Sequence, residues 1–288
     1  MNLSGRTAIV TGASRGLGKA IAARLVSDGA DVMLTARDSE VLQAAGEELA
    51  ASCPAPNQRV VWQAGDVAVA EDVERMTAAT VEQLGRIDVL VSNAGVYGPL
   101  GLIEDVDWAE WVKAIEINLL GTVLACRAVV PIMRKQGGGK IVILSGGGAT
   151  APLPRVSAYA ASKAAVVRFG ETLAEETKDA GIDVNSVAPG ALNTRLTDQI
   201  VEAGPERVGT SLYERALQWQ AGSATPLDVG ADLVAFLAST ESDGITGRLI
   251  AAVWDPWRSF PEQRAKIAAS DVYTLRRIVP EDRGWETS

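Results

Sequence analysis

Short apolar runs rich in β-branched residues alternate with longer amphipathic segments along most of the chain. Several of the short runs are continuously apolar, which is typical of parallel strands covered on both faces. The predicted strands are Thr7–Thr11, Asp31–Thr35, Arg59–Gln63, Ile87–Ser92, Lys140–Leu144, Ile182–Val187 and Arg248–Val253. The predicted crossover helices are Gly16–Asp28, Ser39–Ala51, Ala70–Leu84, Asp107–Lys135 and Ser157–Ala180.

This alternation predicts one α/β domain over residues 1–254, a Rossmann-like, doubly wound fold. Its seven-stranded parallel sheet would carry helices on both faces. Right-handed crossovers place the carboxyl ends of all strands at one edge, where ligands bind. Two segments interrupt the pattern. Residues 195–225 are polar and helical, as expected of a lid over that edge, and residues 255–288 form an extension that we expect to pack on the same domain or on a neighbouring subunit.

The chain has 288 residues and a net charge of −9, which argues against a nucleic-acid or anionic-membrane partner. Histidine is absent, which removes His-based catalytic triads and the usual zinc sites, so no metal is expected. Cys53 and Cys126 match no metal-binding spacing. The short polar segment Met1–Arg6 does not resemble a signal peptide, and no continuous apolar run suits a bilayer span. These features predict a cytoplasmic protein.

A glycine-rich turn, Thr11–Gly18, directly follows the first predicted strand and opens a helix. In that position Gly12 permits a tight turn, Gly16 lets the backbone approach a pyrophosphate, and Gly18 allows the helix to pack closely on the strand. The free N–H groups of the helix terminus favour an anion. The turn therefore predicts a dinucleotide site made by Gly12, Ser14, Arg15, Gly16, Leu17 and Gly18.

The end of the second strand indicates which dinucleotide. Sheets that bind NAD usually carry an acidic residue there for the ribose 2′-hydroxyl, whereas this strand places Ala36 at that point. Arg37 and Arg15 are suited to a 2′-phosphate, because a guanidinium binds phosphate bidentately. We therefore predict NADP, with NAD the less favoured cofactor. Asp38 favours NAD instead if the register shifts by one residue, because its carboxylate would then meet the ribose.

Taken together, the motifs resemble the short-chain dehydrogenase/reductase family. The resemblance covers roughly residues 5–253 and rests on motifs in the family order. These are the glycine turn, Asp66-Val67, Asn93-Ala94-Gly95, Asn118, Tyr159-x-x-x-Lys163, and Pro189-Gly190 followed by Thr194. One such motif arises easily by chance, but the ordered set is specific.

The resemblance implies roles for the cofactor-binding residues. Asp66 would bind the adenine amino group, with the Val67 backbone beside it. Asn93, Ala94 and Gly95 would line the cofactor cleft, and Asn93 would also link neighbouring strands. The segment from Pro189 and Gly190 to Thr194 would flank the nicotinamide.

Tyr159 and Lys163 are four residues apart and so lie on one face of a helix. A free tyrosine has a pKa of about 10, and a nearby ammonium is expected to lower it. The family resemblance implies that hydride passes between nicotinamide and a carbonyl or carbinol carbon while Tyr159 exchanges the proton on oxygen. It also implies that Lys163 holds the ribose hydroxyls and that Asn118 holds a water connecting Lys163 to solvent.

One catalytic position departs from the family pattern. Members usually carry a serine thirteen residues before the tyrosine, and here that position is Gly146. Ser145 comes one residue earlier, which on a regular strand would turn it to the opposite face. The glycines that follow allow the chain to bend and re-aim it. We predict that Ser145 donates a hydrogen bond to the substrate oxygen. The alternative is that Ser145 has a structural role, in which case a water or the Gly147 and Gly148 amides would bind the substrate oxygen instead.

The substrate is expected to be an apolar small molecule with a carbonyl or secondary alcohol, held by the lid and nearby loops. The predicted lining is Tyr97, Leu100, Leu153, Leu192, Leu196, Tyr213 and Trp219. The family resemblance implies a homodimer or homotetramer. The chief prediction is an NADP-dependent oxidoreductase. The alternative is a weak or inactive NADP-binding regulatory or scaffold protein on the same fold, and Gly146 is its only support.

Overall fold

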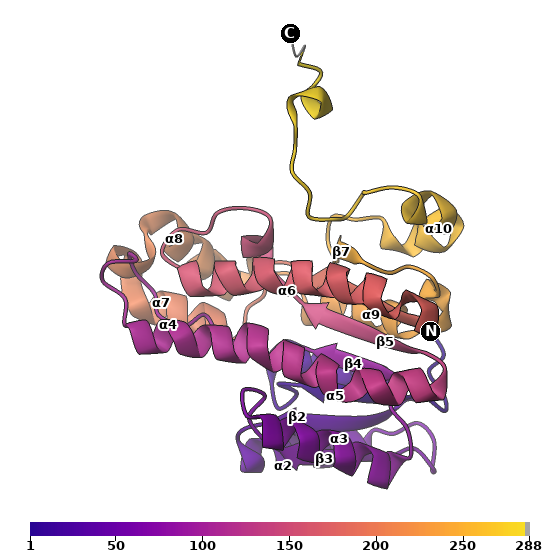
Figure 1. Ribbon diagram of the computed structural model, residues 1–288. Coiled ribbons are helices and arrows are strands. Elements are labelled where there is room, and N and C mark those ends of the chain that lie inside the picture. Colours follow the sequence, from indigo (N-terminus) through magenta and orange to yellow (C-terminus); the bar gives the residue numbers. More distant parts are fainter. Residues whose placement is uncertain (286–288) are drawn as a thin grey trace.

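The computed structural model describes residues 1–285, in which seven parallel strands form one sheet between two layers of helices (Figure 1). The sheet order is β3-β2-β1-β4-β5-β6-β7. The strands are β1 (Thr7–Thr11), β2 (Asp31–Ala36), β3 (Val60–Ala64), β4 (Val89–Ser92), β5 (Gly139–Leu144), β6 (Ile182–Ala188) and β7 (Arg248–Ala251). Each predicted strand is present with its ends shifted by at most two residues, and the predicted fold class is confirmed.

The order of the strands places the ligand edge. The chain runs outward from β1 to β2 and β3, and then returns to the other side of β1 with β4. Ala8 of β1 is in register with both Val32 of β2 and Val89 of β4. The loops that follow β1 and β4 therefore diverge on opposite sides of the sheet. This divergence opens a crevice at their carboxyl ends, as in other doubly wound folds.

The apolar faces of the helices and strands form two buried clusters, one on each side of the sheet. One cluster receives α1 (Gly16–Ser27), α2 (Ser39–Ala51) and α9 (Leu227–Ala238). The other receives α3 (Ala70–Leu84), α5 (Gly121–Gln136) and α6 (Ser157–Thr177). The sequence pattern did not indicate α9, eight of whose twelve residues are buried.

The predicted helix over residues 107–135 is interrupted. It consists of α4 (Trp108–Ile115), a π-helical turn over Glu116–Leu120, and α5. Within residues 1–285 this is the one stretch long and apolar enough, by length and composition, to cross a membrane. Glu110, Lys113 and Glu116 interrupt it, so it is not a continuous apolar run of the kind that the sequence was expected to lack. Its inner face nevertheless packs on the sheet through Val129 and Met133, which are fully buried.

The predicted lid consists of α7 (Arg195–Val208), α8 (Thr210–Gln218) and a π-helical turn over Trp219–Ser223. Val208, Leu212 and Ala216 are buried there in a small apolar cluster of their own. The lid lies to one side of the sheet, above the ends of α4 and α6 (Figure 1).

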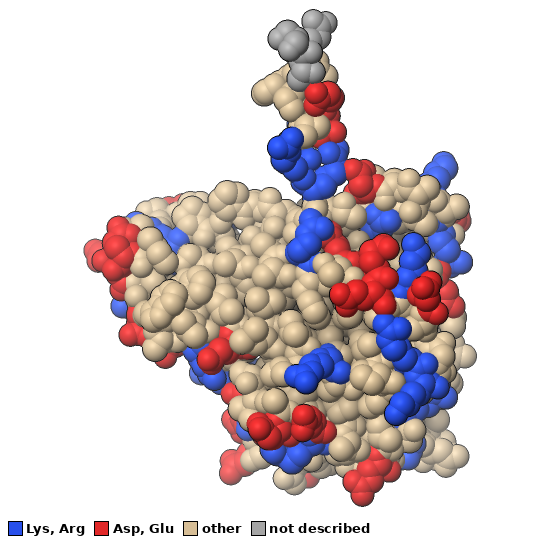
Figure 2. Space-filling model, viewed as in Figure 1, with Lys and Arg blue, Asp and Glu red and all other residues tan. Residues whose placement is uncertain are grey.

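The C-terminal extension begins inside the domain. Trp257 and Phe260 are 1% exposed and belong to the same cluster as α1 and α9, as does Ile267 of α10 (Phe260–Ala268). The guanidinium of Arg248 donates to three carbonyl oxygens of the extension, those of Ile267, Ser270 and Val272. The Leu275 amide still donates to the Glu171 carboxylate of α6, and after this contact the chain leaves the body as an extended arm (Figures 1 and 2).

Candidate active site

A cavity of about 1470 Å³ lies at the carboxyl ends of the strands, under the lid. It exceeds the 300–1,000 Å³ of a usual small-ligand pocket and has room for a dinucleotide beside a substrate. Every predicted site residue except Asn118 lines it. These are Gly12, Ser14, Arg15, Gly16, Leu17, Gly18, Arg37, Asp66, Val67, Asn93, Ala94, Gly95, Ser145, Tyr159, Lys163, Pro189, Gly190 and Thr194.

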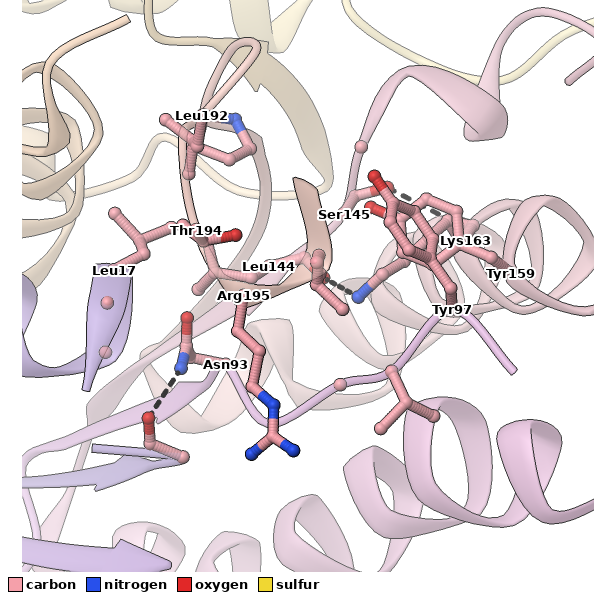
Figure 3. Close-up of a pocket in the computed structure, with 18 of the residues that line it drawn as sticks. Leu17, Asn93, Tyr97, Leu144, Ser145, Tyr159, Lys163, Leu192, Thr194 and Arg195 are labelled. Atoms are coloured by element: carbon pink, nitrogen blue, oxygen red, sulfur yellow. Dashed lines mark hydrogen bonds between the residues drawn. The ribbon is translucent and has the colours of Figure 1, made fainter. Parts of the chain in front are cut away.

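The glycine turn forms a tightly packed cradle at one end of the cavity. A Cβ at position 18 would lie 2.2 Å from the carbonyl oxygen of Gly12, so helix α1 approaches the turn too closely for any side chain there. Gly12 has a φ of 65°, and its Cβ would lie 2.9 Å from the Cα of Ala94. Asn93 closes the cradle from β4, because its amide donates to the carbonyl oxygens of Thr11 and Gly12 (Figure 3).

The cavity wall at the end of β2 has both basic and acidic groups. Arg37 and Arg15 are exposed and line the cavity beside Ala36. Asp38 also lines the cavity, and one of its carboxylate oxygens accepts from the Val41 amide as the N-cap of α2. Its other oxygen lies 3.7 Å from the Arg15 guanidinium. Asp38 is thus held by a cap and an ion pair, although it remains about half exposed.

A third arginine, Arg195, lines the same cavity and was not predicted from the sequence. Figure 3 shows its side chain crossing the cavity from the end of the β6 loop toward the Asn93 side. Arg195 is the first residue of α7, after the capping residue Thr194. A cation is disfavoured at a helix N-terminus by the helix dipole. That mismatch is the sequence signal that would have marked Arg195 as a ligand-binding residue.

The segment after β6 forms the opposite wall. Gly190 has a φ of 100°, and a Cβ there would lie 2.7 Å from the Thr225 hydroxyl oxygen. Thr194 caps α7, and its side chain lies beside the glycine turn, since a Cβ at Gly16 would meet the Thr194 methyl at 3.7 Å. Asp66, after β3, accepts from the Ala68 amide, so one of its oxygens already has a partner.

Tyr159 and Lys163 project from one face of α6 into the cavity (Figure 3). The Lys163 ammonium donates to the Leu144 carbonyl oxygen at 2.8 Å and lies 5.5 Å from the centre of the Tyr159 ring. Burial lowers the pKa of Lys163 to about 8. Burial also raises the pKa of Tyr159, and the neighbouring Tyr97 raises it further. The expectation that the pKa of Tyr159 is lowered is therefore wrong, because burial and the neighbouring Tyr97 both raise it.

Asn118 lies behind the cavity wall instead of on it. It is 1% exposed and occupies the π-helical turn. Its amide accepts from the backbone N–H of Val96 and donates to the Val96 carbonyl and the Ser162 hydroxyl, with distances of 2.8 to 2.9 Å. The Asn118 carbonyl accepts from Thr122. In this arrangement Asn118 fixes the loop after β4, and its predicted role in holding a water remains a prediction.

The departure at Gly146 has a geometric counterpart. A Cβ at position 146 would lie 2.5 Å from the Tyr159 hydroxyl oxygen, so the tyrosine fills the space that a side chain would need. Ser145 borders the cavity, but it is 4% exposed and its hydroxyl donates to the Lys163 carbonyl oxygen at 3.2 Å. Its hydroxyl is thus directed at the α6 backbone, as expected if Ser145 has a structural role and does not bind the substrate oxygen.

Most of the predicted substrate lining is at the cavity. Tyr97, Leu153, Leu192, Leu196 and Trp219 line it, together with Trp254, which is 73% exposed. Leu100 and Tyr213 do not line it and pack instead in the apolar cluster of the lid.

Comparison with known proteins agrees with this geometry. Residues 6–204 match the family model described as "short chain dehydrogenase". The chain is 36% identical over 250 residues to the pig protein "Dehydrogenase/reductase SDR family member 4", a match that covers 86% of each chain. The chain belongs to the short-chain dehydrogenase/reductase family. It is therefore an oxidoreductase of the NAD(P)-using kind.

Other family members resemble the chain in different ways. It is 36% identical over 244 residues to the 2-(R)-hydroxypropyl-CoM dehydrogenase of Xanthobacter autotrophicus, which covers 84% of this chain and 94% of the relative. Levodione reductase superimposes with a TM-score of 0.79 and 32% identity, over 90% and 99% of the two chains. A gluconate 5-dehydrogenase from Burkholderia cenocepacia, solved with NADP and tartrate, gives a TM-score of 0.76 at 26% identity, over 87% and 94%.

The residues of this chain fit the family cofactor. The glycine turn leaves main-chain N–H groups at the start of α1 uncovered by side chains, which suits a pyrophosphate. When bound, a nicotinamide dinucleotide supplies or accepts the hydride. Lys163 and Tyr159 line the same cavity, where Lys163 would hold the ribose hydroxyls and Tyr159 would exchange the proton on the substrate oxygen.

Proposed function

We propose that the protein is an NADP-dependent carbonyl reductase or secondary-alcohol dehydrogenase acting on an apolar small molecule. The observation that carries the proposal is the Tyr159–Lys163 pair on the wall of one cavity with the glycine turn. The aliphatic and aromatic side chains at the lid end favour an apolar substrate. Spectrophotometric assay of NADPH oxidation across a panel of ketones and aldehydes tests it.

The preference for NADP is supported by charge. Arg15, Arg37 and Arg195 line the cavity, and strand β2 ends at Ala36 without a carboxylate. Asp38 is the counter-argument, but its partnership with Arg15 and with the α2 N-terminus occupies it. An anionic 2′-phosphate would therefore meet more cationic than anionic side chains at this wall.

A first prediction concerns cofactor choice. The change Arg37→Ala is expected to weaken NADPH binding about tenfold or more and NADH binding less than twofold, since a hydrogen bond to a charged group contributes about 1.5–3 kcal/mol. Dissociation constants from fluorescence titration of both cofactors measure this. Arg283→Ala, on the exposed C-terminal arm, is the control. Equal losses for the two cofactors would count against NADP.

A second prediction concerns pH. Because burial lowers the pKa of Lys163 to about 8, its ammonium is present below that pH and is lost above it. The value of kcat/KM with respect to NADPH, which reports on the protein without cofactor, is expected to fall as pH rises through about 8. Lys163→Arg keeps its charge throughout and should lack this limb. A wild-type profile that stays flat up to pH 10 would refute the assignment.

The alternative, an NADP-binding regulatory or scaffold protein, rests on the glycine at position 146. Calorimetric binding of NADPH without turnover across the whole panel would favour it. Turnover of any ketone or alcohol that requires Tyr159 would exclude it.

A further inference from the structure

The carbonyl oxygen of a substrate beside Tyr159 meets one hydroxyl fewer than the family pattern provides. Position 146 has no side chain, and the Tyr159 hydroxyl lies where a Cβ would be. Ser145 does not replace the missing group, because its single hydroxyl proton is donated to the Lys163 carbonyl oxygen. A second side-chain hydroxyl at this corner would therefore have to come from another element.

Tyr97 is placed to supply it. Its ring packs edge-on against that of Tyr159, with 4.8 Å between the centroids. Figure 3 shows the two rings side by side and directed toward the Ser145 end of the cavity. Both side chains line the cavity and are partly buried. Within residues 1–285 neither phenol hydroxyl has a hydrogen-bond partner, so each is available to a ligand.

The backbone on both sides of Tyr97 is fixed. Asn118 binds the N–H and the carbonyl of Val96 with two 2.8 Å hydrogen bonds. Gly98 has a φ of 73° and packs so closely on α4 that a Cβ there would lie 2.6 Å from the Ala114 Cβ. A side chain held this way loses little conformational freedom when it binds a ligand. The π-helical turn that carries Asn118 thus serves to position Tyr97.

We infer that Tyr97 is a second catalytic hydroxyl, which donates a hydrogen bond to the substrate oxygen in place of the serine that Gly146 lacks. This inference rests on the proposed function. In the reducing direction the hydride adds to the carbonyl carbon, the C=O π bond breaks, and the oxygen takes the Tyr159 proton. Tyr97 keeps its own proton and stabilises the charge that develops on the oxygen.

The chemistry of Tyr97 suits a donor that is not itself deprotonated. Burial raises its pKa to about 12, so it stays protonated across the working range of pH. A phenol so placed donates a hydrogen bond at neutral pH, whereas a group that titrated near neutrality would lose its proton in part of that range. Tyr159 and Tyr97 are therefore chemically similar groups with different roles, set by which of them lies beside Lys163.

The test removes one oxygen atom. Tyr97→Phe keeps the ring and is expected to lower kcat about 100-fold, as does the loss of one oxyanion donor in other enzymes. The melting temperature and the dissociation constant of NADPH should stay close to wild type. Tyr213→Phe is the matched control, because Tyr213 packs in the same apolar cluster but does not line the cavity. Ser145→Ala is expected to lower kcat less than tenfold.

Each of the following outcomes would overturn the inference. Tyr97→Phe could leave kcat within twofold of wild type, or raise KM with kcat unchanged, which would make the hydroxyl a binding group only. Ser145→Ala could lower kcat more than Tyr97→Phe, which would make Ser145 the donor. A wild-type protein that binds NADPH but turns over no member of the panel would overturn the proposed function and this inference with it, whereas the other outcomes leave the function standing.

Discussion

Tyr159→Phe is expected to reduce turnover about 1,000-fold while NADPH still binds. General acid–base catalysis contributes typically 10²- to 10⁴-fold, and the phenol oxygen of Tyr159 is the group beside Lys163 that can exchange a proton with the substrate. The ring itself would remain packed against Tyr97, so the fold and the cavity should be unchanged. Steady-state rates of NADPH oxidation on the best ketone, together with NADPH titration, measure both effects.

The control for this change is Tyr273→Phe, which removes a phenol oxygen far along the chain, where the ring packs on Phe260. Its turnover should equal that of wild type. If Tyr159→Phe retained more than a tenth of wild-type turnover, the proton would come from elsewhere and the assignment of Tyr159 would fail.

Gly18→Ala is expected to abolish cofactor-dependent activity by a different route. The new methyl group would lie 2.2 Å from the Gly12 carbonyl oxygen and 2.5 Å from the Asn93 amide nitrogen, so α1 must move away from the turn. Overpacking of this kind costs about 1–3 kcal/mol of the free energy of unfolding. The melting temperature should fall by roughly 2–10 °C, and the NADPH dissociation constant should rise at least tenfold.

A second glycine separates the loss of stability from the loss of binding. Gly85 ends α3 with a φ of 85°, and no atom lies within 4 Å of its Cβ position. Gly85→Ala therefore strains the backbone without crowding the site, and it should lower the melting temperature while leaving NADPH affinity unchanged. If Gly18→Ala bound NADPH as well as Gly85→Ala does, the close approach of α1 would have no part in cofactor binding.

The arrangement of strands and crossover helices was largely predictable, because it depends on local pattern. Helices α2 and α3 have the bounds that the periodicity predicts. Helix α9 was missed, since eight of its twelve residues are buried and period alone does not distinguish a short, largely buried helix from a buried strand. The π-helical turn was missed because it depends on Asn118 bonding to Val96, a contact between residues 22 positions apart.

The site was predictable where a role depends on the main chain and less so where it depends on side-chain direction. Glycines identify the turn because only they allow its close contacts. The direction of Ser145 depends on how β5 ends against α6, and the sequence left two alternatives open. The pKa of Tyr159 was expected to fall, but it rises, because the depth of burial comes from the lid and loops rather than from the Tyr-x-x-x-Lys spacing.

The buried extension also bears on how the chain folds during its synthesis. Leu3 and Ile267 belong to one apolar cluster, although they stand near opposite ends of the chain. That cluster cannot close until the chain has been synthesised past Ile267, and contacts so distant in sequence form slowly. Until then, the part of α9 around Phe236, against which the Trp257 ring packs, remains open to solvent, in a state prone to aggregation. A segment made late, residues 257–267, thus completes a core that begins at Leu3.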